Sequence, residues 1–343
     1  MTAPDRARLR HDWIHARLGD AIESVEPASA DASFRSYWRV HLADGGTRIV
    51  MDAPPDKEDV APWLDIAGRL RRAGVHAPQV HAADTSAGFL LLEDLGTRTY
   101  LPALDDHSVD ALYGAALDTL LQMQARADTG GLPDYDEARL VAEMELLPEW
   151  FLRRHLGVVP ECEEWDTIES AFRMLVDSAR SQPRTFVHRD YHSRNLLVLD
   201  QGGPGVIDFQ DAVLGPVTYD LVSLLRDCYI AWPIDRVDAW VEGYRRRLVE
   251  AGLSDADARR FRRWFDLMGL QRHIKVLGIF CRLWYRDGKA SYLGDLPLVW
   301  RYTDEVMALY PEFEGLRTLL QRWIGGRDLR IPRGRDDTST ATP

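Results

Sequence analysis

Two carboxylates and an amide lie close together in the segment FVHRDYHSRNLLVLDQGGPGVIDFQDA, which spans residues 186–212. Asn195 and Asp208 offer oxygen ligands of the kind that Mg²⁺ prefers, and Mg²⁺ needs few protein ligands where phosphates supply the others. Asp190 is then left to accept a proton from a hydroxyl nucleophile. The segment therefore predicts phosphoryl transfer, with Asp190 as the base and Asn195 and Asp208 as metal ligands.

The spacing inside this segment carries further information. A His-Arg-Asp tripeptide ends at Asp190, Asn195 follows at the interval H-R-D-x-x-x-x-N, and a hydrophobic strand then leads to an Asp-Phe pair at Asp208. This arrangement resembles the phosphoryl-transfer machinery of protein kinases. A zinc site at His188 and His192 is the weaker alternative, because no third ligand lies nearby in the sequence.

A β-rich part and a larger helical part must position these residues. Alternating apolar and polar residues predict strands at 35–42 and 47–51, joined by the turn ADGG, and GFLLLEDLG at 88–96 is typical of a buried strand. Helical periodicity predicts helices at 5–19, 57–74, 108–128, 137–156, 163–179, 219–230, 235–250, 255–285 and 298–323. We therefore expect an α+β, bilobal fold.

The expected division of the chain follows from this change of character. Residues 1–95 are predicted to form a small β-rich, nucleotide-binding N-lobe. Residues 96–330 are predicted to form a large helical C-lobe that carries the catalytic loop and the substrate site. The polar, proline-capped residues 331–343 are expected to be a disordered tail.

Composition narrows the classes of protein that fit. The formal net charge of −12 argues against general binding of nucleic acid, because phosphate backbones attract basic surfaces. Three scattered cysteines show no spacing typical of zinc ligands or disulfides, which favours the reducing cytoplasm. The chain starts without the apolar run of a signal peptide, and nowhere do about 18 apolar residues follow one another, so we expect no membrane span.

Beyond these motifs, the chain resembles the aminoglycoside phosphotransferase family, the small-molecule branch of the protein-kinase-like fold. LLEDLG at 91–96 looks like that family's hinge, and DFQDAVLGPVTYDLVSLLRDCYI at 208–230 looks like its metal-binding strand end and the helix that follows. The resemblance implies ATP and Mg²⁺ as cofactors, with adenine held by backbone groups after the hinge glutamate. It also matches Asp220 to a buried aspartate that holds the catalytic loop, although a plain first-turn acid of a helix explains that residue equally well.

The resemblance is closer to one branch of this family. QDAVLGPVTYDLVSLLRDCYIAW at 210–232 and LMGLQRHIKVLGIFCRLWYRDGK at 267–289 look like the amino-sugar kinases of cell-wall recycling. This likeness implies that ATP phosphorylates the anomeric C1 hydroxyl of N-acetylmuramate and N-acetylglucosamine. It implies a small-molecule amino sugar and ATP as partners, and we expect no obligate protein partner.

The nucleotide site departs from the protein-kinase pattern. Protein kinases carry a lysine on the second strand of this pair, but the strand from residue 47 has none. The nucleotide loop, SADASFRSYW at 29–38, has small residues where glycines would be. Lys57, or an arginine such as Arg35 or Arg48, is expected to cover the phosphates instead, unless Mg²⁺ carries more of the charge. The expected ATP contacts are Ala32, Ser33, Phe34, Arg48, Lys57, Glu93, Asp94 and Leu95.

Substrate contacts are expected from the helical part. LQRHIKVL at 270–277 interrupts an apolar helix with charges, which need partners such as a polar ligand or salt bridges. An arginine fork at Arg272 would suit the lactyl carboxylate of N-acetylmuramate. The candidates are His192, Arg226, Asp227, Gln271, Arg272, His273, Lys275 and Trp150, with exposed helix charge and core packing as the ordinary alternatives.

Three rival functions stay open. The same fold could phosphorylate an aminoglycoside, choline or homoserine. A catalytically inactive kinase-like binding protein would explain the missing lysine, but such a protein has no need of Asp190, Asn195 and Asp208 together. A protein kinase is disfavoured, because no activation segment ending in Ala-Pro-Glu follows Asp208.

Overall fold

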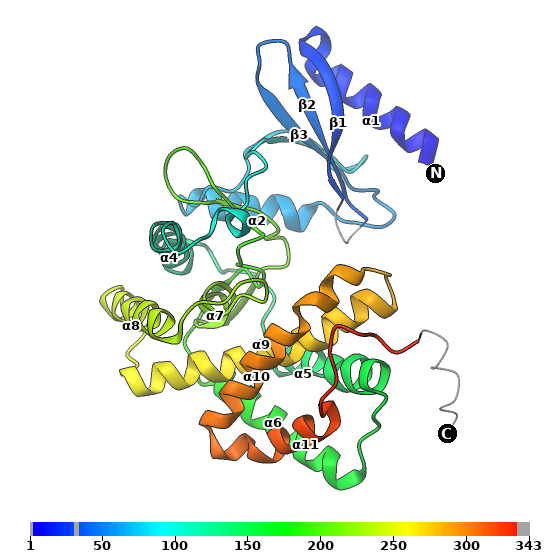
Figure 1. The fold of residues 1–343 in the computed structure, drawn as a ribbon. Coiled ribbons are helices and arrows are strands. Elements are labelled where there is room, and N and C mark those ends of the chain that lie inside the picture. The colour runs from blue at the N-terminus through cyan, green and yellow to red at the C-terminus, as the bar shows by residue number, and fades with distance from the viewer. Residues whose placement is uncertain (1–2, 31–33, 335–343) are drawn as a thin grey trace. The chain divides into compact units, whose positions relative to one another are not determined.

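The computed structural model describes residues 3–30 and 34–334 (Figure 1). These residues form two compact units, and each is described below by itself. The units comprise residues 1–128 with 194–212, and residues 129–193 with 213–343. The predicted boundary between lobes after residue 95 stays a prediction, and most of the predicted tail at 331–343 lies outside the described residues.

The first unit contains a five-stranded antiparallel sheet. Its strands, in spatial order, are β1 (Ile22–Ala30), β2 (Ser36–Leu42), β3 (Thr47–Asp52), β5 (Phe89–Glu93) and β4 (Val80–Asp84). Val40, Val50 and Leu91 share one face, and this face packs against Trp13 and Ile14 of helix α1 (Ala3–Leu18), which Figure 1 shows beside the sheet. Side chains on the opposite face of the sheet line a pocket, which is described below with the candidate site.

The two strands missing from the sequence prediction are the edges of this sheet. β1 contains Pro27 and two register shifts against β2, and half-buried β4 has a register shift against β5. Proline and bulges are tolerated at a sheet edge, where one side of the backbone needs no ladder partner. The central strands were predicted: β2 and β3 from the alternation and the turn between them, and β5 from its continuous apolar run.

Short elements complete the first unit. They are η1 (Gly19–Ala21), α2 (Ala61–Arg72), α3 (Tyr100–Ala103), α4 (Val109–Arg126) and the strand pair β7 (Leu196–Leu197) and β8 (Gly205–Val206). A bridge between Thr99 and Leu197 connects this strand pair to the segment after β5. A hydrogen bond from the Val206 N–H to the His76 carbonyl connects it to the segment before β4. The pair thereby brings residues after 194 to the sheet.

The second unit is largely helical. Its elements are α5 (Glu137–Met144), the π-helical η2 (Leu147–Leu156), α6 (Cys162–Arg180), β6 (Arg184–Val187), β9 (Val213–Pro216), α7 (Tyr219–Leu225), α8 (Ile234–Glu250), α9 (Ala258–Tyr285), η3 (Ala290–Asp295), α10 (Leu296–Leu309), η4 (Pro311–Phe313) and α11 (Glu314–Ile324). The 28-residue helix α9 is buried along most of its length. It lies so close to the turn before η2 that a side chain at Gly278 would meet the Leu146 backbone.

Two predicted helices are wrong in their details. The segment predicted as one helix at 137–156 consists of α5 and the π-helical η2. Pro148 lies in the first turn of η2. The segment predicted at 298–323 is divided between α10 and α11, because Pro311 cannot continue the first helix. The predicted α+β class itself is confirmed, with an N-terminal antiparallel sheet and a large helical part.

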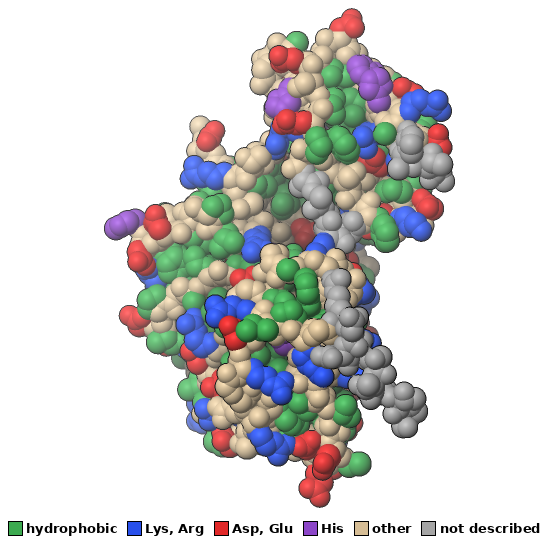
Figure 2. All heavy atoms as spheres, turned by 45° about the vertical axis from the view of Figure 1, so that its right-hand side comes forward, with side chains coloured by type: hydrophobic (Ala, Val, Ile, Leu, Met, Phe, Trp, Pro, Cys, Tyr) green, Lys and Arg blue, Asp and Glu red, His purple; other side chains and the backbone are tan. Residues whose placement is uncertain are grey.

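The surface agrees with the mixed composition of the chain. Figure 2 shows acidic and basic side chains interspersed over the described part of the face in view. In the described residues, none of the helices combines the length and the apolar character needed to cross a membrane.

Candidate active site

A pocket of about 390 Å³ lies within the first unit, on the sheet face opposite α1. Arg39, Ile49 and Leu92 are cross-strand neighbours on β2, β3 and β5, and they form one wall. The segment after β5 and the residues around Asn195 and Asp208 form the rest of the lining. The pocket thus gathers the predicted hinge and the two predicted metal ligands.

Asn195 and Asp208 lie next to each other on this pocket. The Asn195 Nδ2 donates to Asp208 Oδ2 at 3.3 Å, and the Ile207 N–H donates to the Asn195 carbonyl at 3.1 Å. Gln210 Nε2 donates to the second carboxylate oxygen of Asp208 at 3.0 Å. Asn195 directly precedes β7 and Asp208 follows β8, so these hydrogen bonds hold the two side chains together at one end of the strand pair.

This donor set fits a hard divalent cation. Among the described residues, no group of three or more His, Cys, Asp or Glu side chains could hold a metal. Asn195 and Asp208 instead offer one amide and one carboxylate, which suits Mg²⁺ that takes its other ligands from phosphates and water. Asp208 also has a left-handed backbone, with φ of 63°, and strain of this kind persists where the surroundings fix a functional side chain.

The hinge residues line the same pocket. Asp94 accepts hydrogen bonds from the Arg39 guanidinium at 2.6 and 3.1 Å and from the Gly96 N–H at 2.9 Å. Burial raises the pKa of Asp94, but Arg39 and Gly96 together lower it below its ordinary value. Glu93 is bound in turn by His76 and the Gln79 N–H. Glu93, Asp94 and Leu95 all line the pocket, and their contact with adenine stays a prediction.

The residues predicted to contact the phosphates do not all lie in the same part of the first unit. Lys57 is exposed, with its ammonium 5.8 Å from the ring centre of exposed Phe34, so these two lie side by side. Arg48 pairs with Val40 across the sheet and so shares the α1 face instead of the pocket face. Ala32 and Ser33 lie outside the described residues.

Arg39 is the cation on the pocket wall that sequence reasoning missed. It alternates with Trp38 and Val40, whose side chains pack toward α1, so its own side chain faces the pocket. The alternation was visible in the sequence. Which face of the strand borders the pocket could be known only from the fold.

The loop of residues 188–193, called the HRD loop below, lies in the second unit. Asp190 is partly exposed at the surface of this unit. Burial raises the pKa of Asp190, but Lys275, His192, Arg272 and His188 outweigh it and lower the pKa below its ordinary value. Asp190 is therefore a carboxylate at neutral pH, in the form that a general base requires.

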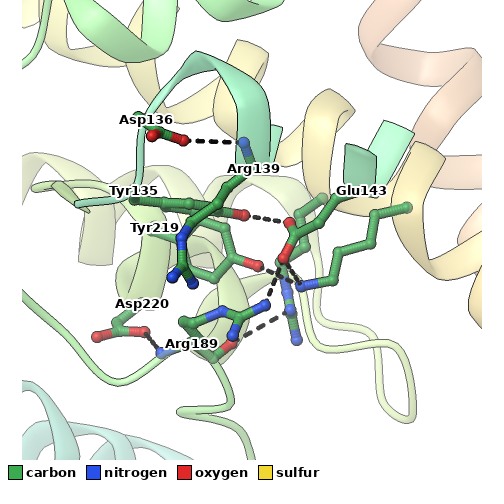
Figure 3. A network of polar contacts seen from close by, with 9 residues as sticks. Tyr135, Asp136, Arg139, Glu143, Arg189, Tyr219 and Asp220 are labelled. Carbon is green, nitrogen blue, oxygen red and sulfur yellow. Dashed lines mark hydrogen bonds and ion pairs between the residues drawn. The ribbon is translucent and has the colours of Figure 1, made fainter. Parts of the chain in front are cut away.

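Buried Asp220 holds the backbone of this loop. Its carboxylate accepts the N–H group of Arg189 at 3.0 Å (Figure 3) and that of His188 at 2.6 Å, as the family resemblance implied. Burial raises its pKa to about 7, although both N–H donors act in the opposite direction. Arg189 has φ of 78°, and Arg189 and Asp208 are the two non-glycine residues with positive φ in the described chain.

Glu143 of α5 is the centre of a polar network beside the loop (Figure 3). Its carboxylate accepts from the Tyr135 hydroxyl, the Arg189 guanidinium and the Lys275 ammonium. Sequence reasoning missed Glu143, because the exposed acids Glu137 and Glu145 stand near it in the chain and nothing in the local spacing distinguishes it from them. Its partners Arg189 and Lys275 are distant in the sequence, so only the folded structure identifies it.

The charged residues in the buried middle section of α9 have partners within the protein. Lys275 lies 2.8 Å from Glu143 and donates to the Tyr219 hydroxyl at 3.1 Å. Arg272 donates to the Arg189 carbonyl at 3.4 Å, and His273 Nε2 contacts the Arg226 carbonyl at 3.1 Å. The Gln271 amide is fully buried, and its oxygen and nitrogen have no hydrogen-bond partner among the described residues.

The remaining substrate candidates also make internal contacts. Buried Arg226 pairs with buried Asp266 at 2.9 Å. Asp227 accepts from the N–H and hydroxyl of Ser193, so it holds the end of the HRD loop. The His192 ring packs edge-on against Tyr229, and Trp150 lies on η2 beside Arg154. The roles of all eight candidates in sugar binding stay predictions.

Comparison with known proteins identifies relatives over almost the whole chain. A family model described as the phosphotransferase enzyme family matches residues 24–265. A curated protein of Pseudomonas aeruginosa named N-acetylmuramate/N-acetylglucosamine kinase is 48% identical over 86% of this chain and 87% of its own length. A protein of the same name from Pseudomonas putida is 45% identical over 92% of this chain and 95% of its own.

Solved structures agree on the fold. An ADP-bound aminoglycoside phosphotransferase matches 86% of this chain and 97% of its own with a TM-score of 0.58, at 15% identity. An ethanolamine kinase of Plasmodium vivax matches 89% of this chain and 87% of its own with a TM-score of 0.60, at 10% identity. The predicted protein-kinase-like fold and the predicted family are both confirmed. The chain belongs to the phosphotransferase enzyme family and is a phosphotransferase with a hydroxyl acceptor.

Proposed function

We propose that the chain is a kinase that transfers a phosphoryl group from ATP to the anomeric C1 hydroxyl of N-acetylmuramate and N-acetylglucosamine. The observation that carries this proposal is the 48% identity, over 86% of the chain, to a kinase named for these two sugars. The likeness to kinases of cell-wall recycling makes peptidoglycan recycling in the cytoplasm the proposed setting.

The pocket of the first unit is the proposed ATP site. Backbone groups of Glu93, Asp94 and Leu95 would contact adenine, since these residues line the pocket beside the sheet. Lys57 would approach the phosphates from its place beside the Phe34 ring. A solved phosphotransferase of the same fold was obtained with ADP, which supports an adenine nucleotide here.

Asn195 and Asp208 are the proposed ligands of Mg²⁺. Their adjacent amide and carboxylate suit an ion that completes its coordination with phosphate oxygens and water. Bound Mg²⁺ would neutralise the negative charge of the phosphoryl group during transfer. Gln210 would keep the Asp208 carboxylate oriented through its hydrogen bond.

Asp190 is the proposed base for the sugar hydroxyl. It is held in the charged form by the surrounding cations, which include Lys275 and Arg272. Four residues separate it from Asn195, so the chain alone keeps their Cα atoms within about 18 Å. A hemiacetal hydroxyl is more acidic than an ordinary alcohol, so positioning supplies most of the rate.

The position of the phosphate on the product tests this proposal. The protein is incubated with ATP, Mg²⁺ and each sugar, and ³¹P NMR is expected to place the new phosphate on C1. The matched control is the methyl glycoside of N-acetylglucosamine, which lacks a free C1 hydroxyl and should give no product. Phosphate at another position, or turnover only with an aminoglycoside, choline or homoserine, contradicts the proposal. Turnover that survives excess chelator contradicts the metal assignment.

A further inference from the structure

Glu143 is a largely buried anion, with its side chain 12% exposed, and it joins three parts of the second unit. It lies on α5 and accepts from Tyr135, from Arg189 of the HRD loop and from Lys275 of α9 (Figure 3). Burial raises the pKa of Glu143, but Lys275 and Arg189 outweigh burial and lower it below its ordinary value. The carboxylate is therefore charged and bound to two cations at once. A buried charge persists only when its partners compensate its lost hydration.

Arg189 is held at its N–H, its carbonyl and its side chain. Asp220 accepts its N–H at 3.0 Å, Arg272 donates to its carbonyl at 3.4 Å, and Glu143 binds its guanidinium. Its φ of 78° costs a non-glycine residue about 1–2 kcal/mol, so the conformation depends on these contacts. Asp190 is the next residue. The contacts fix the peptide group between Arg189 and Asp190, and this peptide orients the Asp190 side chain.

We propose that Glu143 is a positioning residue of phosphoryl transfer: its ion pairs with Arg189 and Lys275 fix the HRD loop in the strained conformation that orients Asp190 toward the acceptor hydroxyl. This inference rests on the proposed role of Asp190 as the base. Glu143 itself touches neither the sugar nor ATP in this account. It acts through Arg189 and Lys275.

The neighbouring charges explain how a change at Glu143 can displace Asp190. Arg189 and Lys275 both lose their shared anion when Glu143 becomes neutral. Lys275 already interacts with Asp190, whereas the other acids that bind the loop, Asp220 and Asp227, are engaged by its N–H groups and the Ser193 hydroxyl. The two cations are then expected to move toward Asp190 and displace it. A displacement of about 1 Å at a reacting group can lower a rate by about 100-fold.

The test is the variant Glu143→Gln, which keeps the shape and removes the charge. We expect kcat to fall about 100-fold, while KM for ATP and KM for the sugar stay within about threefold. Thermal unfolding should show that the variant is folded at the assay temperature. The matched control is Glu145→Gln, the same change at an exposed position two residues along, and its kcat should stay within about twofold of the parent.

A merely structural role would give a different pattern. A folded Glu143→Gln with kcat within about threefold of the parent overturns the inference, as does a loss of activity that equals the unfolded fraction. If that variant does not fold, Tyr135→Phe replaces it, because it removes only the hydroxyl that donates to Glu143. Its kcat should fall about 3- to 10-fold with both KM values kept, and an unchanged kcat overturns the inference.

Failure of this inference can be told from failure of the proposed function. If Asp190→Asn keeps its kcat, the base assignment is wrong, whatever Glu143 does. If Asp190→Asn is inactive while folded Glu143→Gln is fully active, only the positioning role of Glu143 is wrong.

Discussion

Asp220 on α7 accepts the backbone N–H of Arg189 at 3.0 Å, and its other carboxylate oxygen accepts the N–H of the preceding residue. One buried side chain therefore satisfies two consecutive backbone donors of the loop that carries Asp190. Without it, both donors would be buried and unpaired, which costs about 1–3 kcal/mol each.

The first prediction follows from this contact. Asp220→Ala should lower the free energy of unfolding by about 2–5 kcal/mol, because both N–H groups lose their acceptor. Asp220→Asn keeps one side-chain oxygen as an acceptor and should cost less. Urea denaturation of the two variants checks this order. Equal losses for both variants would show that the N–H contacts contribute little.

The second prediction is that His273 makes the stability of the folded protein depend on pH. Burial lowers the pKa of His273 to about 3, and the Arg226 carbonyl that accepts from Nε2 opposes this only in part. An unfolded histidine binds a proton near pH 6.5 while the folded one does not, so stability is lost as pH falls from 6.5 toward 3. Between pH 7 and pH 5 this histidine should cost the folded protein about 2 kcal/mol.

The variant His273→Gln isolates this effect from the titration of the carboxylates. It should be less stable than the parent at pH 7, because the ring stacked on Tyr302 is lost. The difference should shrink by about 2 kcal/mol at pH 5, since the variant has no proton to exclude. Urea denaturation at both pH values measures it. A difference that is the same at pH 7 and pH 5 would contradict a buried, neutral His273.

Arg272 offers a comparison between the two sugars. Its guanidinium contacts the Arg189 carbonyl and is almost fully buried, which favours a role in holding the loop. Arg272→Met should therefore lower kcat for N-acetylmuramate and N-acetylglucosamine by similar factors. The sequence had suggested a contact with the lactyl carboxylate, which only N-acetylmuramate carries. A KM increase confined to N-acetylmuramate would favour that contact and argue against the loop role.

The proximity of Asn195 and Asp208 could be predicted from the sequence because the information is local. A short segment carries Asp190, Asn195 and Asp208, and their interval is characteristic enough to indicate both the chemistry and the family. The structure places Asn195 and Asp208 in direct contact. The central strands and most helices were equally accessible, since their periodicity is regular.

Residues whose role depends on distant partners could not be predicted in the same way. Glu143 contacts Lys275 across 132 positions of sequence, and the exposed acids Glu137 and Glu145 stand close to it in the chain. Arg39 was passed over because the face of β2 that borders the pocket depends on where α1 packs. The charges of α9 suggested a ligand, but each charged side chain of its buried middle section has a protein contact.

Single-turnover kinetics of Asp190→Asn tests the central claim most directly. The substitution keeps the size of the side chain and removes its ability to accept a proton. We predict a loss of several orders of magnitude in kcat, with ATP binding measured by calorimetry kept within about threefold. A kcat within about tenfold of the parent would contradict the assignment of Asp190 as the base.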